Sequence, residues 1–146
     1  GQIAGATLTP PQSFKADAVG FARLANTYHL PYQNVGVVVR KADVEPRAEL
    51  WERVLRAFRE GIHRWYDDPK LAKEALTKYT KERDPEMLQK TYDFFTRQAG
   101  FNKELIPTDQ GIQQILTFVG STTLPAAKDV PPTRFYDPRI LERLKK

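Results

Sequence analysis

Three Asp-Pro pairs after the first sixty residues of the chain are strong signals for helix starts. They stand at positions 68–69, 84–85 and 137–138. An aspartate oxygen accepts a hydrogen bond from a free amide of the first helical turn, and proline lacks the N–H group that would be unpaired there. The apolar residues that follow each pair recur at steps of three or four, which places them on one helical face. The sequence therefore predicts three helices with defined starting points.

Two further helices are predicted from apolar spacing. The first is long and starts near Arg47, and its predicted core face holds Trp51, Val54, Leu55, Phe58, Ile62 and Trp65. The second starts at Thr108, with Ile112, Ile115, Leu116 and Val119 facing inward. Residues 122–133 contain three of the eleven prolines, so we predict a loop there.

The first forty residues have a different pattern, in which short apolar runs alternate with turn signals. We predict strands at 3–8, 21–25 and 34–40, because each is a short run of apolar or β-branched residues. The strands at 3–8 and 35–40 should be neighbours in one sheet, since isolated strands leave their backbone groups unpaired. Between the first two strands, Thr9 is predicted to cap a short helix that ends at Gly20. Strand, helix and strand in this order are typical of an α/β layer.

The predicted fold class is therefore α/β and helix-rich. A chain of 146 residues is long enough for one domain with its own core. We assign residues 1–45 to a strand, helix and strand segment of the α/β lobe, and residues 46–146 to a helical C-terminal part of the same domain.

Few residues suit catalysis or metal binding. The chain has no cysteine, and its two histidines, His29 and His63, are far apart in the sequence. Asp68 is explained as a helix cap and Asp67 as its solvated neighbour. The sequence has no Gly-rich phosphate loop and no nucleophile elbow. We therefore predict a binding protein that is not an enzyme and that uses no metal or cofactor.

The net charge of +5 does not indicate nucleic-acid binding. The 23 basic residues are scattered among 18 acidic ones and form no dense run, so we expect no nucleic-acid partner. No apolar run approaches the ~20 residues of a membrane span. The first residues lack the layout of a signal peptide, and the chain begins without Met in a predicted strand. We therefore expect a fragment of a longer protein.

The turn that follows the first predicted strand is the best candidate for a binding site. In an open α/β sheet, ligands collect where strands end and helix N-termini present free amides. Thr9, Pro10 and Ser13 lie at this turn, and two of them carry hydroxyl groups. The alternative is that Thr9 serves only as a helix cap.

Several short motifs occur in an order that points to one family. The segment Gly1–Pro10 is compared with the form G-x-x-x-A-x-x-x-x-P, with Gly5 standing at the alanine position, and Gly20-Phe21-Ala22-Arg23-Leu24-Ala25 and Val35–Arg40 follow it. The later motifs are the helix Leu50–Trp65 with Ala57 and Gly61, then Asp84–Tyr92, Gly111-Ile112-Gln113 and Phe135-Tyr136-Asp137. Together they make the chain resemble the nitrate, sulfonate and taurine type of ABC-transporter solute-binding proteins, a group that includes binders of thiamine-pyrimidine precursors.

The resemblance implies the C-terminal portion of a two-lobed type II periplasmic-binding-protein fold. Such a bacterial, periplasmic protein closes on a small polar or anionic solute in a cleft between its lobes and delivers it to an ABC-transporter permease. This chain would form one wall of the cleft, with Tyr32, Gln33 and Asn34 as further donors beside the turn. Many family members have an acidic residue where this chain has Thr9, and a neutral threonine favours an anionic or uncharged solute over a cation.

Two alternative functions come from different classes. The first is an enzyme of the related pyrimidine-precursor synthesis type, although two histidines and no cysteine argue against its His-rich site. The second is a helical protein-interaction module, which is favoured if the first forty residues are disordered. Because the predicted sheet keeps open edges, we also expect the chain to complete it with the missing N-terminal half or with a second copy.

Overall fold

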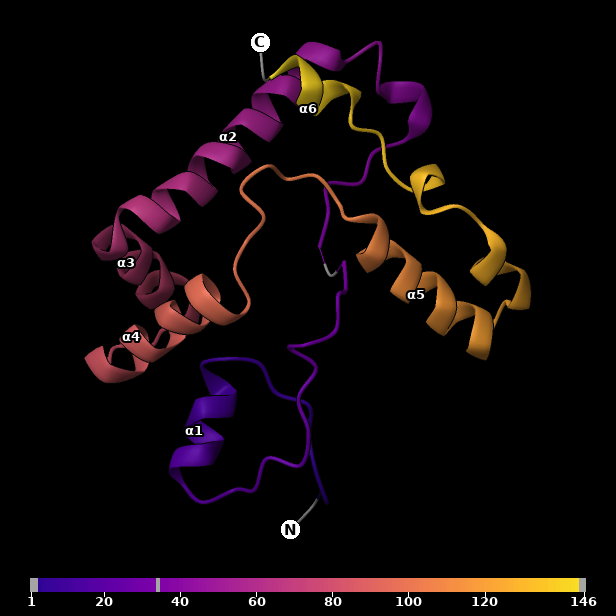
Figure 1. Ribbon diagram of the computed structural model, residues 1–146. Coiled ribbons are helices and arrows are strands. Elements are labelled where there is room, and N and C mark those ends of the chain that lie inside the picture. Colours follow the sequence, from indigo (N-terminus) through magenta and orange to yellow (C-terminus); the bar gives the residue numbers. More distant parts are fainter. Residues whose placement is uncertain (1–2, 34, 145–146) are drawn as a thin grey trace. The chain divides into compact units, whose positions relative to one another are not determined.

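The computed structural model describes residues 3–33 and 35–144, and all regular structure within them is helical. Figure 1 shows the six α-helices in chain order. They are α1 (Gln12–Ala18), α2 (Ala48–Asp67), α3 (Pro69–Thr80), α4 (Pro85–Asp93), α5 (Asp109–Thr122) and α6 (Arg139–Arg143). Shorter 3-10 segments are η1 (Lys41–Asp43), η3 (Pro125–Asp129) and η4 (Pro132–Arg134), and η2 (Phe94–Gln98) is a π-helix that continues α4. The prediction of a helix-rich chain is confirmed.

Two of the Asp-Pro pairs start helices in the predicted way. The Asp68 carboxylate accepts a hydrogen bond from the Leu71 amide at 3.0 Å. The Asp84 carboxylate accepts one from the Met87 amide at 2.8 Å. In both helices proline occupies the first helical position, so α3 and α4 begin where local chemistry alone places them.

The Asp137-Pro138 pair also precedes a helix, but its aspartate is used differently. Pro138 itself is the N-cap residue of α6, and no side chain caps this helix. The Asp137 carboxylate instead accepts hydrogen bonds from the backbone and guanidinium N–H groups of Arg139. The predicted loop at 122–133 contains η3 and the start of η4, so it is more ordered than its prolines indicated.

The three predicted strands are not formed among the described residues. Residues 3–8, 21–25 and the described part of 34–40 have no strand pairing, and most of their side chains are exposed. The expectation that 3–8 and 35–40 are neighbouring strands is therefore wrong for this structure. The reason is that β-branched and apolar residues favour a strand, whereas a strand exists only when another strand pairs with its backbone groups.

Helix α1 begins two residues later than a Thr9 cap would require. Its N-cap residue is Pro11, and no side chain caps it. The Thr9 backbone carbonyl accepts a hydrogen bond from the Ser13 amide at 3.1 Å. At this helix start the hydrogen bond is therefore made by the Thr9 backbone and not, as predicted, by the Thr9 hydroxyl. Gly20 follows the helix with a φ of +88°, a conformation that glycine adopts without steric cost, which confirms the predicted end.

The chain divides into two compact units, each built from two separate stretches of sequence. The first combines residues 1–27 with 62–101, and the second combines residues 28–61 with 102–146. Helix α2 contributes to both units, and none of its residues is fully buried, so its predicted core face is only partly covered. The division at residues 45 and 46 rests on a change in sequence pattern and stays a prediction.

Aromatic side chains form the centre of the first unit. Phe14 from α1 meets Phe94 edge-on at a centroid distance of 5.9 Å, and both rings are buried. Trp65 packs on Tyr92 at 5.5 Å, and its indole N–H donates to the Thr96 hydroxyl at 3.2 Å. Aromatic pairs of this kind contribute packing beyond the area that they bury. Residues from both sequence stretches therefore share one core.

The second unit has its core where α5 packs against η3. Ile112 and Leu116 from α5 and Ala127 from η3 are buried together, with Val119 and Tyr136 at the edge of the cluster. This confirms the inward face predicted for the helix that starts at Thr108. Figure 1 shows η3, in gold, turning back beside the end of α5.

The short helix α6 is also part of the second unit. Ile140 and Leu141 of α6 and its C-cap residue Leu144 are all buried. The Arg59 guanidinium of α2 donates to the Leu144 carbonyl at 3.2 Å. Apolar burial and one long-range hydrogen bond therefore attach α6 to the rest of the unit.

Candidate functional site

Three of the predicted binding residues belong to the first unit, two in the turn before α1 and Ser13 in the first turn of α1. Thr9 is exposed, whereas Pro10 is buried. Ser13 is only 8% exposed, and its hydroxyl makes no hydrogen bond among the described residues. Of the two predicted hydroxyl donors, Thr9 is thus accessible to a solute in this structure and Ser13 points into the protein interior.

The other predicted donors belong to the second unit. Tyr32 is exposed, and Gln33 is partly buried. The Gln33 side-chain amide donates to the Val35 carbonyl at 2.6 Å, so this group already has a partner. Asn34 lies outside the described residues. The turn and these residues fall in different units, and their meeting at one site stays a prediction.

Tyr32 and Gln33 instead lie against the start of α5. The Thr108 hydroxyl caps this helix by accepting the Gly111 amide at 3.1 Å. A Cβ atom placed on Gly111 would lie 2.9 Å from that hydroxyl oxygen and 3.1 Å from the Gln33 backbone nitrogen. Residue 111 therefore has no room for a side chain. The sequence patterns did not predict this close approach of Gly111 to Thr108 and Gln33, although Gly111 opens one of the family motifs.

A second polar contact completes the start of α5. The Tyr136 hydroxyl donates to the Asp109 carboxylate at 2.9 Å. This hydrogen bond, together with burial and the nearby negative charge, raises the pKa of the Tyr136 hydroxyl. The hydrogen bond from Tyr136 thus ties the segment that precedes α6 to the start of α5.

The strongest electrostatic feature of the first unit is the carboxylate of Glu82, which lies between α3 and α4 and is only 7% exposed. The Lys15 ammonium lies 2.6 Å from it, and the Arg83 and Asp84 amides donate to its other oxygen at 2.8 and 2.9 Å. The Lys15 ammonium and these two amides lower the pKa of Glu82 to about 2. Every partner stabilises the charged form, so Glu82 anchors α1 and does not act as a general acid.

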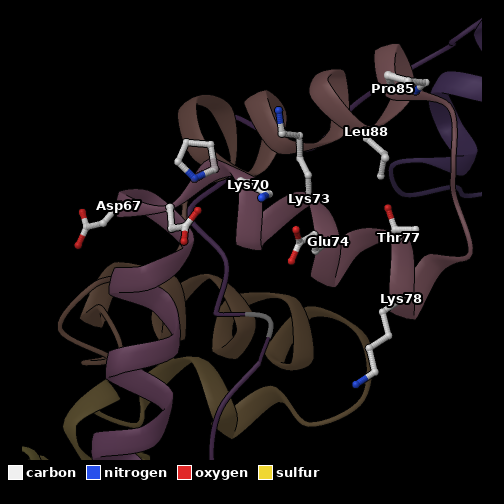
Figure 2. Close-up of a pocket in the computed structure, with 10 residues that line it drawn as sticks. Asp67, Lys70, Lys73, Glu74, Thr77, Lys78, Pro85 and Leu88 are labelled. Carbon is white, nitrogen blue, oxygen red and sulfur yellow. The ribbon is translucent and has the colours of Figure 1, made fainter.

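An open groove of about 840 Å³ runs between α3 and α4 in the first unit. Figure 2 shows its side chains, with Leu88 and Pro85 from α4 facing residues of α3. Its charged groups are Lys70, Lys73, Lys78, Asp67, Asp68 and Glu74. Three positive and three negative groups cancel, and Asp68 is committed to its helix cap. The groove therefore has no net preference for a charged ligand, and sequence reasoning did not find it.

Two further surveys of the described residues bear on function. No group of three or more histidine, aspartate or glutamate side chains is arranged to hold a metal ion in this part of the protein. No helix there combines the length and the apolar character that crossing a membrane requires.

Comparison with known proteins identifies no relatives: no family model matches the chain, and neither a curated protein nor a solved structure shows significant similarity to it. What the structure defines is therefore a helix-rich chain of two compact units.

Proposed function

We propose that this chain is part of the extracytoplasmic solute-binding component of a bacterial ABC importer, and that it delivers a small polar or anionic solute to a permease. The observation that carries the proposal is the order of the family motifs from residue 1 to residue 137. The complete receptor would have the two α/β lobes of a type II periplasmic-binding protein. This chain would supply one wall of the cleft between the lobes.

The local chemistry around Thr9 supports this proposal. Thr9 is exposed, and the neighbouring Pro10 is buried. The ion pair between Lys15 and Glu82 attaches the following helix to the rest of the unit. A neutral hydroxyl on such a supported turn suits a hydrogen bond to an anionic or polar solute.

The test is isothermal calorimetry on the complete gene product with nitrate, taurine and a thiamine-type pyrimidine as probes. Thr9→Val removes the hydroxyl and keeps the shape of the side chain, so we expect affinity for the bound probe to fall by about tenfold. Thr27→Val is the matched control, because Thr27 is also exposed but lies outside the turn. Binding of none of the probes, or equal affinity in both variants, would contradict the proposal.

A helical interaction module is the second candidate function. It is supported by the absence of strands among the described residues and by large apolar side chains that helices expose, such as Tyr79 on α3 and Phe118 on α5. Under this function the complete gene product would bind none of the solutes. A Phe118→Ser variant would instead lose a protein partner in cross-linking.

A further inference from the structure

Gly61 lies in the interior of α2, and neither of the usual structural reasons for a glycine applies to it. Gly111 and Gly120 of α5 lie against neighbouring groups, so a Cβ atom there would be crowded. A Cβ atom on Gly61 would meet nothing within 4 Å, and the residue is exposed. Its φ angle is not positive either. Because glycine weakens an exposed helix interior relative to alanine, residue 61 is a weak point of α2 that packing does not require.

This weak point coincides with the division of the chain into two compact units. Helix α2 is continuous from Ala48 to Asp67, yet the second unit includes it only up to Gly61 and the first unit includes it from Ile62. The chain also passes between the units at residues 27–28 and 101–102, and both of these places lie outside helices. Irregular backbone changes its φ and ψ angles without breaking helical hydrogen bonds, whereas a helix does not. The stiffness of α2 therefore decides whether the units change their orientation.

The part of α2 that precedes Gly61 is bonded to the second unit. The Trp51 indole N–H donates to the Asp43 carbonyl at 2.8 Å. The Arg59 guanidinium, two residues before Gly61, donates to the Leu144 carbonyl at 3.2 Å. Both acceptors belong to the second unit, so these contacts hold this part of the helix within that unit.

The part of α2 that follows Gly61 is bonded to the first unit. The Trp65 indole N–H donates to the Thr96 hydroxyl at 3.2 Å, and the Tyr66 hydroxyl donates to the Phe101 carbonyl at 2.9 Å. Both acceptors belong to the first unit. The side-chain contacts of α2 thus change from one unit to the other between Arg59 and Trp65, on either side of the glycine.

We infer that Gly61 makes α2 a hinge at which the two compact units change their orientation. Opening the hinge breaks the backbone hydrogen bonds that span residue 61, where the helix is weakest, and the change in φ and ψ is confined to these few residues. The contacts of Arg59 and Trp65 stay in place, because each lies within one unit. The inference is independent of the proposed solute-binding function, since it uses only the contacts of α2.

The distance between two spin labels tests the hinge. The chain has no cysteine, so Arg53→Cys in α2 and Glu74→Cys in α3 provide the only attachment sites. Both residues are exposed, and they belong to different units. Double electron–electron resonance on the labelled 146-residue chain should give a broad distance distribution when residue 61 is glycine and a narrower one in Gly61→Ala. Distributions of equal width would overturn the inference.

Moving the glycine by four residues is the matched control. Ala57→Gly combined with Gly61→Ala keeps the composition of the helix and places its glycine between Trp51 and Arg59, which are both bonded to the second unit. The distance distribution of this double variant should therefore be as narrow as that of Gly61→Ala. A distribution as broad as that of the unmodified protein would show that the position of the glycine does not matter, and the hinge would be wrong.

Amide hydrogen exchange on the unlabelled chain gives a second measurement. In a helix the amides of residues 62–65 donate to the carbonyls of residues 58–61, so these amides are released when the hinge opens. We expect Gly61→Ala to slow their exchange by about fivefold and to leave the amides of residues 52–56 unchanged. Equal slowing along the whole of α2 would show a general stabilisation of the helix and would contradict a hinge at residue 61.

Discussion

At the scale of single residues, Gly111 shows how one missing side chain allows a tertiary contact. A Cβ atom there would crowd both the capping hydroxyl of Thr108 and the Gln33 backbone. We expect Gly111→Ala to lower the free energy of unfolding by about 1–2 kcal/mol, because the cap or the neighbouring backbone must shift. Gly61→Ala is the control, since its Cβ would meet nothing within 4 Å and should stabilise α2 by about 0.5–1 kcal/mol. The free energy of unfolding of both variants is measured by urea unfolding. If both substitutions stabilise the protein, the inference that a Cβ atom at residue 111 crowds its neighbours is wrong.

The Glu82 carboxylate gives a prediction about pH at the same scale. Its pKa is lowered to about 2 from an ordinary value of 4.5. A carboxylate with a lowered pKa stabilises the folded state fully above the ordinary value, and this contribution is lost as the pH falls toward the folded value. Glu82→Gln should therefore be less stable than the unmodified protein above pH 5, and the two should converge as the pH falls from 4.5 to 2.

The measurement is urea unfolding at a series of pH values. Glu104→Gln removes an exposed carboxylate from a loop and serves as the control. A stability difference for Glu82→Gln that stays constant between pH 5 and pH 2 would show that the contact with Lys15 does not form.

At the scale of elements, α6 is attached to the second unit both by buried apolar side chains and by ion pairs, and the two contributions can be compared. Ile140 is only 4% exposed, while Glu45 pairs with Arg139 and Arg143 at 2.9 and 3.0 Å through side chains that are about half exposed. Removing a buried isoleucine side chain costs about 2–4 kcal/mol at such a site. An exposed ion pair contributes less than about 1 kcal/mol. Burial should therefore dominate.

We accordingly expect Ile140→Ala to destabilise the protein several times more than Glu45→Gln does. Chemical unfolding at low and at 1 M salt provides the comparison, since salt screens the ion pairs and leaves apolar burial in place. A larger loss for Glu45→Gln, or a strong salt effect on the unmodified protein, would show that charge holds α6.

At the scale of the whole molecule, the chain consists of two compact units with separate cores. Leu116 lies in the core of the second unit, and Tyr92 lies in the aromatic core of the first. We expect Leu116→Ala to accelerate amide exchange mainly within residues 28–61 and 102–144, because local stability follows local packing. Tyr92→Ala should act mainly within residues 3–27 and 62–101. Uniform acceleration across the chain in either variant would contradict the division into units.

Neighbouring residues alone set where three of the helices begin. Asp68, Asp84 and Thr108 form their caps with amides three residues away, so these starts depend only on neighbouring residues. Apolar spacing likewise predicted the inward face of α5, which the buried Ile112 and Leu116 confirm. Such features are local in the chain, and for that reason sequence patterns record them.

Features that depend on residues far apart in the sequence could be learned from the folded structure alone. The predicted strands have no pairing partner among the described residues. The Thr9 side chain does not cap α1, whose N-cap residue is Pro11. The contacts of Lys15 with Glu82 and of Gly111 with Gln33 join distant parts of the sequence. The sequence named candidate residues for the site but not their arrangement, because a pattern of neighbours does not specify which distant groups will meet.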